Sequence, residues 1–183
     1  MEKLLFVLML FLPVTAWSAN MTYMLDVQIN TAEQTITGNA RLKADADIKL
    51  NLSVENLKVL NLDGNGIADV TGDILHVSLQ SGKEVNIRYE ALIHKNRMNF
   101  IDKDYVFLTS GWYPQPDDPV EYALNVTLPK NFMAISESEH TTIKKQGSAK
   151  TFMFEFNHPL DSLHLAASSR YVQKKDRYKS IDI

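Results

Sequence analysis

Histidines and carboxylates are the side chains from which this sequence could build a catalytic or metal centre, because its 183 residues include no cysteine. A zinc hydrolase of the H-E-x-x-H type needs two histidines on one turn of a helix and a third ligand. None of the five histidines forms such a pair, although His158 and His164 flank Pro159 closely enough to share a face. We therefore expect solvent-facing or hydrogen-bonded histidines, and no metal or other cofactor bound by this chain. The histidines are His76, His94, His140, His158 and His164.

Motifs for a catalytic nucleophile are missing as well. No G-x-S-x-G elbow occurs, and no serine lies near a plausible base in the sequence. The segment from Asn61 to Gly66 matches half of a calcium loop. Asn61 and Gly72, however, stand where such a loop needs an aspartate and a bidentate glutamate, so we interpret the segment as a β-turn. The chain alone therefore has no catalytic motif, although a longer parent protein could be an enzyme.

The first 19 residues have the order of a secretory signal peptide. Lys3 gives a charged start, Leu4 to Leu12 form an apolar run, Pro13 interrupts it, and small residues follow up to Ala19. The run is shorter than the ~20 residues that a transmembrane helix needs. We therefore expect export to the periplasm or the medium, and no membrane span once the signal is removed. A net charge of -3 without basic clusters argues against a nucleic-acid partner.

Two-residue alternation of apolar side chains runs through the rest of the chain, which is typical of strands that bury one face. The expected strands cover residues 23–29, 36–42, 48–54, 75–79, 85–89, 122–128, 152–156 and 163–167. The first two predict a hairpin, and the pair joined by Ser81 and Gly82 predicts another. The region from Ser53 to Leu60 could hold at most a helical turn. The sequence therefore predicts one all-β domain over residues 20–183, either an antiparallel sandwich or a large curved, saddle-like sheet.

The stretch from Gly111 to Glu121 differs in composition from the rest of the chain. Three prolines restrict its backbone, two aromatic residues offer large contact surfaces, and three carboxylates add negative charge. Such a loop suits an interface anchor or a platform for stacking sugars, and it could equally fold its own rings over an open sheet end. Because the prolines remove amide donors, we expect the loop to leave the sheets and Trp112 to face a partner. The candidate interface or ligand residues are Trp112, Tyr113, Pro114, Gln115, Asp117, Asp118 and Glu121.

This stretch also resembles the aminopeptidase N family of zinc metallopeptidases, in which Phe-Pro, a spacer and Asp-Glu-Pro precede a strand that ends in Leu-Pro. Here Tyr113-Pro114 and Asp117-Asp118-Pro119 occupy those places, and residues 122–129 form the strand. The resemblance implies the saddle-shaped N-terminal β domain of that family, which packs on a thermolysin-like zinc domain. The family's Thr-Gln-x-Glu and Ala-Arg-Arg segments are replaced by residues 108–112, and the catalytic domain is absent from this sequence.

The leading hypothesis is therefore a non-catalytic N-terminal β domain of an exported protein similar to aminopeptidase N family metallopeptidases. It would support and partly wall a neighbouring peptidase domain. Because Tyr178, Ile181 and Ile183 look like the start of another strand, we expect a longer protein with a C-terminal peptidase domain, or else a separate protein partner. The alternative is a free-standing periplasmic binding module for sugar or peptide that uses Trp112 and Tyr113.

Overall fold

The computed structural model describes residues 21–172, 177–178 and 181–182, and the regular structure within these ranges is β-strand alone, as the alternation predicts. The predicted signal segment lies outside the described residues. The strands are β1 Met21–Asn30, β2 Thr35–Ala44, β3 Ile48–Ser53, β4 Leu57–Gly64, β5 Ile67–Thr71, β6 Ile74–Leu79, β7 Glu84–Leu92, β8 Asn99–Ile101, β9 Tyr105–Leu108, β10 Gln115–Pro116, β11 Val120–Pro129, β12 Met133–Ser136, β13 His140–Gln146, β14 Ala149–Leu160, β15 Leu165–Ser168, β16 Arg177–Tyr178 and β17 Ile181–Asp182.

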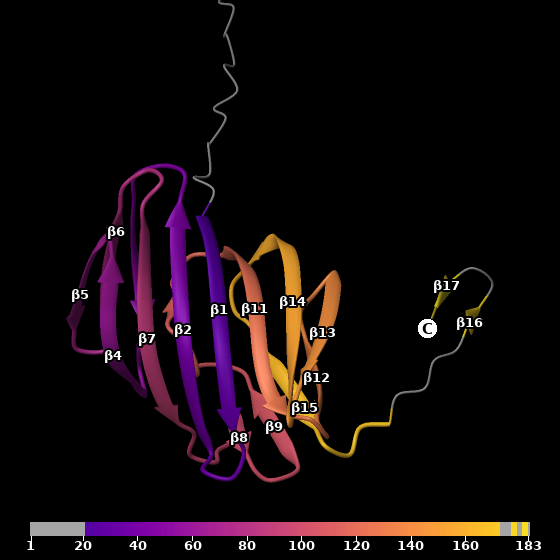
Figure 1. Cartoon of the computed structure of the whole chain (residues 1–183). Coiled ribbons are helices and arrows are strands. Elements are labelled where there is room, and N and C mark those ends of the chain that lie inside the picture. Colours follow the sequence, from indigo (N-terminus) through magenta and orange to yellow (C-terminus); the bar gives the residue numbers. More distant parts are fainter. Residues whose placement is uncertain (1–20, 173–176, 179–180, 183) are drawn as a thin grey trace, which may run out of the picture.

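Seven strands form the large sheet, in the order β13-β14-β11-β1-β2-β7-β4 (Figure 1). Its pairs are antiparallel except for β1 and β11, which run parallel in register from Thr22 beside Glu121 to Gln28 beside Thr127. The predicted first hairpin, β1 and β2, is confirmed. Its turn is closed by the side chain of Asn30, whose carbonyl oxygen accepts two backbone N–H groups.

Two four-stranded sheets accompany the large one, and β16 and β17 form a separate two-stranded sheet. The first, here called the β3 sheet, has the order β10-β3-β6-β5, and the second, the β9 sheet, has the order β12-β15-β9-β8. Their inward side chains join those of the large sheet in a single hydrophobic core, which confirms the predicted sandwich or curved-sheet class. In Figure 1, β5 and β6 lie at the β4 end of the large sheet, and β8 and β9 lie below β1.

The predicted second hairpin is wrong. Strand β6 belongs to the β3 sheet and pairs with β3 and β5, whereas β7 belongs to the large sheet and pairs with β2 and β4. The link between them is held by the β2–β3 connection instead: Gly82 N–H donates to Ala44 O at 2.8 Å, and Ser81 N–H donates to Asp47 Oδ1 at 2.8 Å. The β2–β3 and β6–β7 connections therefore lie side by side, and each carries the chain between the large sheet and the β3 sheet. This is why β6 and β7 do not form the hairpin that alternation predicts.

Strand β4 occupies the second half of the region from Ser53 to Leu60, for which the sequence allowed a helical turn at most. Val54 O accepts the N–H of Leu57 at 3.0 Å, and Asn56 has a positive φ of 64°, so the chain turns tightly and then extends. Farther along the large sheet, the Tyr89 ring on β7 covers Gly38 on β2. A Cβ atom at residue 38 would lie 2.2 Å from Tyr89 Cζ, so only glycine fits there.

Candidate interdomain surface

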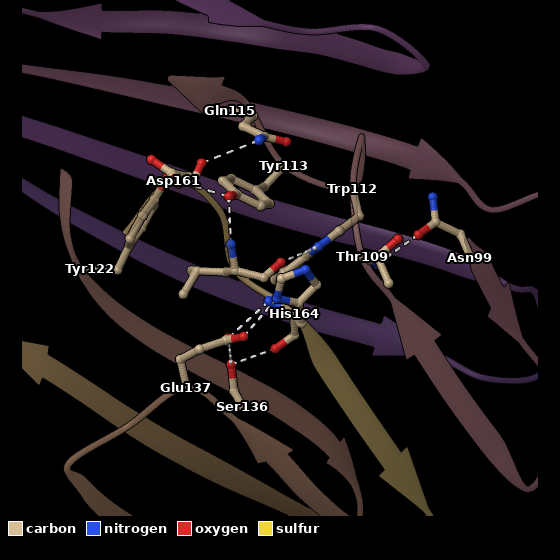
Figure 2. Close-up of polar contacts among 11 residues, drawn as sticks. Asn99, Thr109, Trp112, Tyr113, Gln115, Tyr122, Ser136, Glu137, Asp161 and His164 are labelled. Atoms are coloured by element: carbon tan, nitrogen blue, oxygen red, sulfur yellow. Dashed lines mark hydrogen bonds and ion pairs between the residues drawn. The ribbon is translucent and has the colours of Figure 1, made fainter. Parts of the chain in front are cut away.

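The aromatic residues of the 111–121 stretch lie in the core. Trp112 and Tyr113 are fully buried between β9 and β10, where the chain passes from the β9 sheet to the β3 sheet. Trp112 Nε1–H donates to Leu163 O at 3.2 Å, and Leu163 N–H donates to Tyr113 Oη at 2.9 Å (Figure 2). The two rings meet edge to face with centroids 4.7 Å apart. These contacts tie the stretch to the β14–β15 connection.

The expectation that Trp112 faces a partner is therefore wrong. The space between the ends of the two small sheets accommodates both rings, so the stretch folds its own aromatics over an open sheet end. The prolines do not keep the stretch out of the sheets either: Gln115 and Pro116 form β10 and pair with Ser53 and Leu52. Because β10 is an edge strand, the missing amide of Pro116 costs no ladder bond. Neither ring is accessible to a sugar or peptide, which removes the basis of the binding-module alternative.

Four buried tyrosines surround this junction. Tyr23 Oη–H donates to Pro114 O, Tyr113 Oη lies 3.4 Å from Tyr122 Oη, and the rings of Tyr23 and Tyr122 pack 5.3 Å apart. Burial raises the pKa of all four hydroxyls, including that of Tyr89, so they stay protonated and neutral. The hydroxyls of Tyr23, Tyr113 and Tyr122 contact one another or the backbone, whereas the buried Tyr89 hydroxyl has no partner among the described residues. All four side chains lie in the core, so we interpret the cluster as structural.

The exposed part of the stretch is its carboxylate segment. Asp117, Asp118 and Glu121 face solvent, Pro114 is buried, and Gln115 is half-buried with its Nε2 donating to Asp161 O at 3.4 Å. Asp118 and Glu121 also line a small cleft of about 220 Å³ between the start of β1 and the β3 sheet. That these carboxylates contact a partner stays a prediction.

The outer face of the β9 sheet carries the apolar surface that the sequence did not reveal. One register row crosses its four strands, from Phe100 on β8 through Phe107 and Ala166 to Ile135 on β12. Ile135 is 62% exposed and Phe107 is 39% exposed, and the two phenylalanine rings stack with centroids 5.9 Å apart. Tyr105 and Met98 are further exposed side chains on β9 and beside β8. We call Met98, Phe100, Tyr105, Phe107, Ile135 and Ala166 the β9-sheet face.

Charged groups border the β9-sheet face. At one end the His164 ring Nδ1 lies 2.7 Å from Glu137 Oε1, and the His164 N–H donates to Glu137 Oε2 at 2.9 Å (Figure 2). Partial burial raises the pKa of Glu137, but the hydrogen bonds from His164 outweigh this effect and lower the pKa below its usual value. At the other end Arg170 Nη2 lies 2.5 Å from Asp104 Oδ2. An apolar centre with a charged border is the composition of a protein interface.

The two histidines that the sequence singled out do not form a metal site. His164 pairs with Glu137, and His158 Nε2 lies 3.1 Å from Glu139 Oε1, so each has its own glutamate. Within residues 21–172 and the two short described segments after them, no three His, Asp or Glu side chains converge on a point that could hold a metal ion. Among the same residues, no helix is long and apolar enough to cross a membrane.

Two-residue alternation does not reveal the β9-sheet face, because strand β9 does not alternate between apolar and polar residues. Residues 105–108 read Tyr-Val-Phe-Leu, so both faces of the strand are apolar. Val106 and Leu108 point into the core, and Tyr105 and Phe107 point out. A short strand that is apolar on both faces is typical of one covered on both sides, and this signal could have identified the face.

Comparison with known proteins finds similar solved structures but no similar sequence. No protein-family model and no curated protein sequence matches the chain. A mutant M1 zinc metallopeptidase from Deinococcus radiodurans, bound to a Tyr-Ser-Ala substrate, matches with a TM-score of 0.65 at 16% sequence identity over 90% of this chain and 46% of that chain. A two-domain M1 zinc metallopeptidase mutant bound to L-tryptophan matches with a TM-score of 0.64 and the same identity and coverage.

The chain has a β fold that M1 zinc metallopeptidases contain. The resemblance predicted from the Tyr113-Pro114 and Asp117-Asp118-Pro119 segments is thereby confirmed as a likeness of fold. Another structure of an M1 zinc metallopeptidase from Deinococcus radiodurans matches with a TM-score of 0.62 at 16% sequence identity. This M1-type β fold spans a little under half of the length of the solved chains, 45–46%.

Proposed function

We propose that this chain is a non-catalytic β domain of an exported protein and that it supports and partly walls a neighbouring zinc peptidase domain. The M1-type β fold supports this proposal, because the solved chains that share it are zinc metallopeptidases and one of them is described as two-domain. In such a protein the zinc ligands would come from the other domain, since the described residues of this chain contain no metal-ligating cluster.

The β9-sheet face is the observation that carries the proposal. A solvated sheet face normally presents polar side chains, whereas this face presents a row that is apolar on all four strands and carries large side chains on β8, β9 and β12. Burying a fully exposed side chain of this size contributes about 1.5–3 kcal/mol. Phe107 and Ile135 are 39% and 62% exposed, so covering each would contribute a corresponding part of that value. The face therefore has the chemistry of a permanent contact with another folded domain.

The chain after β15 also stays at this sheet. Ser169 N–H donates to Asp104 O at 3.0 Å, Arg170 pairs with Asp104, and Tyr171 and Val172 follow as exposed apolar residues. A domain joined beyond this point would be held next to the β9-sheet face, where its effective concentration is high.

Site-specific photocrosslinking tests the docking role in the cell that makes the protein. A photoreactive phenylalanine analogue replaces Phe107 or Ile135 in the full chain, and Lys58, an exposed residue of β4, serves as the matched control position. We expect crosslinks from the first two positions to peptides of a polypeptide segment that carries an H-E-x-x-H motif. The proposal fails if Phe107 and Ile135 give no crosslink, or if Lys58 reaches the same segment equally well.

Export is tested separately by N-terminal sequencing of the protein from the periplasm or medium. We expect cleavage between Ala16 and Asn20, where the small residues required by a signal peptidase occur. An intact Met1 in the membrane fraction would contradict export and leave the docking proposal to be judged on the crosslinks.

A further inference from the structure

The outer face of the large sheet contains a broad polar hollow of about 430 Å³. Two neighbouring register rows cross its floor, perpendicular to the strands. The first runs from Arg88 on β7 through Asn39 and Asp26 to Asn125 on β11. The hollow lies on the face of the large sheet opposite to the core, and it shares no residue with the β9-sheet face.

The second row is built almost entirely from hydroxyl and amide groups. It begins at Glu90 on β7, which does not line the hollow, and runs through Thr37, Gln28, Thr127 and Thr151 to Lys144 on the edge strand β13. The hydroxyl oxygens of Thr127 and Thr151 lie 2.9 Å apart, so these two side chains hold each other in place. Short side chains fixed on a sheet lose little conformational entropy when they bind a ligand.

The charged side chains of the hollow do not all neutralise one another. Asp26 is occupied on both oxygens, because Arg41 Nη2 lies 3.2 Å from Oδ2 and Asn125 Nδ2 donates to Oδ1 at 2.7 Å. Arg88 and Lys144 are exposed, and neither forms an ion pair with any carboxylate in the described part of the chain. Among the residues that line the hollow, the unneutralised charge is therefore positive and lies at two points on opposite sides, with Glu90 outside the lining beside Arg88.

The spacing of those two cations indicates the length of a ligand. Five strand-to-strand steps separate β7 from β13, and at about 4.8 Å per step the two backbones lie about 24 Å apart along the sheet. Only an extended molecule could contact Arg88, the amides and hydroxyls between, and Lys144 at once.

Other classes of ligand fit this lining poorly. A folded protein partner or a lipid surface would need apolar anchors. The apolar side chains that line the hollow are Val27 and Met153, which are too few for either. Nucleic acid would require many cations along the whole track, whereas the centre carries the Asp26 carboxylate. Fixed amides and hydroxyls with two outer cations match a chain of hydroxyl groups that carries carboxylates.

We propose that this hollow binds an extended acidic oligosaccharide of the uronic-acid type, with its hydroxyls on the Thr37–Thr151 row and its carboxylates on Arg88 and Lys144. The proposal is independent of docking to a peptidase domain. Both cationic side chains are exposed, so they can be substituted to weaken ligand binding without altering the core.

The test is titration calorimetry of the purified chain with hexagalacturonate as the probe and maltohexaose as the neutral comparator. We expect saturable binding of hexagalacturonate that weakens as salt is raised, and binding of maltohexaose at least tenfold weaker. The double variant Arg88→Gln/Lys144→Gln should weaken hexagalacturonate binding about tenfold, the size of one charge-assisted hydrogen bond. The matched control Lys83→Gln/Lys130→Gln removes two exposed lysines elsewhere and should bind like the wild type.

Three results would overturn the proposal. The first is no saturable heat with hexagalacturonate at millimolar concentration, which would make the hollow an ordinary solvated sheet face. The second is equal affinity for maltohexaose, which would remove the role of the two cations. The third is equal weakening by the control pair, which would show that only the overall charge of the protein matters.

Discussion

Replacing Trp112 gives the sharpest test of the buried junction between the two small sheets. The side chain is fully buried, its indole N–H donates to Leu163 O, and its ring packs against Tyr113. Truncating a buried tryptophan to alanine costs about 3–5 kcal/mol in the free energy of unfolding. The orphaned Leu163 carbonyl and the lost aromatic pair place Trp112→Ala toward the upper end of that range.

A milder variant keeps the prediction testable if Trp112→Ala does not fold. Trp112→Phe retains most of the ring and removes the N–H donor, so it should cost about 1–3 kcal/mol, the penalty of leaving a buried acceptor unsatisfied. Ile135→Ala, on the exposed β9-sheet face, serves as the control and should cost less than about 1 kcal/mol, because Ile135 is 62% exposed.

Urea unfolding followed by circular dichroism is the appropriate assay. Trp17 lies in the predicted signal, so Trp112 would be the only tryptophan of the mature chain and its fluorescence could not be compared between variants. The slope with urea should stay unchanged while the midpoint falls. A loss below about 1 kcal/mol for Trp112→Ala would refute the burial argument and return the ring to the surface as a candidate anchor.

Three further predictions concern single side chains. Tyr89→Phe should leave the free energy of unfolding unchanged or raise it by about 1 kcal/mol in urea unfolding, because the hydroxyl is buried without a partner among the described residues, and a clear loss would reveal a hidden partner. Gly38→Ala should cost about 1–3 kcal/mol in the same assay, since its Cβ would overlap the Tyr89 ring, and an unchanged midpoint would contradict the close packing. Glu137→Gln should destabilise the protein by about 1 kcal/mol at pH 7. Because the folded pKa of Glu137 is lowered, its contribution is present above the ordinary pKa of about 4.3 and is lost as the pH falls through the folded value, so the unfolding curves of wild type and variant should converge only once the pH is below that lowered pKa.

How far the sequence predicts this fold depends on how each strand is exposed. Strands such as β1 and β11 bury one face and alternate clearly, so they could be predicted from their residues. Strand β13 has all seven residues exposed and β9 is apolar on both faces, so neither shows the two-residue pattern. The assignment of β6 and β7 to different sheets depends on contacts with residues 44–47, which lie far from that turn in the sequence.

The candidate surface was harder to predict than the strands. The composition of residues 111–121 indicates a special segment, but it does not say whether Trp112 and Tyr113 point outward or inward. That direction is set by the space between the β3 and β9 sheets and by hydrogen bonds to the Leu163 backbone. Leu163 lies 51 residues after Trp112 and 50 residues after Tyr113 in the sequence. The β9-sheet face likewise forms only when four strands from distant segments come into register.

The parallel pairing of β1 with β11 has a consequence for how the chain folds. Strands β4, β7, β2 and β1 come from residues 21–92, and strands β11, β14 and β13 come from residues 120–160, so this single ladder joins two antiparallel halves. The first half would be complete long before its partner is synthesised, and it would expose the ten-residue edge of β1 until β11 arrives. Closing that non-local ladder is the slow step expected for such a topology. A cut between Leu92 and Asn99 would yield two fragments with matching free edges, and their reassembly would measure the combined strength of the β1–β11 ladder, the β10–β3 pairing and the shared core.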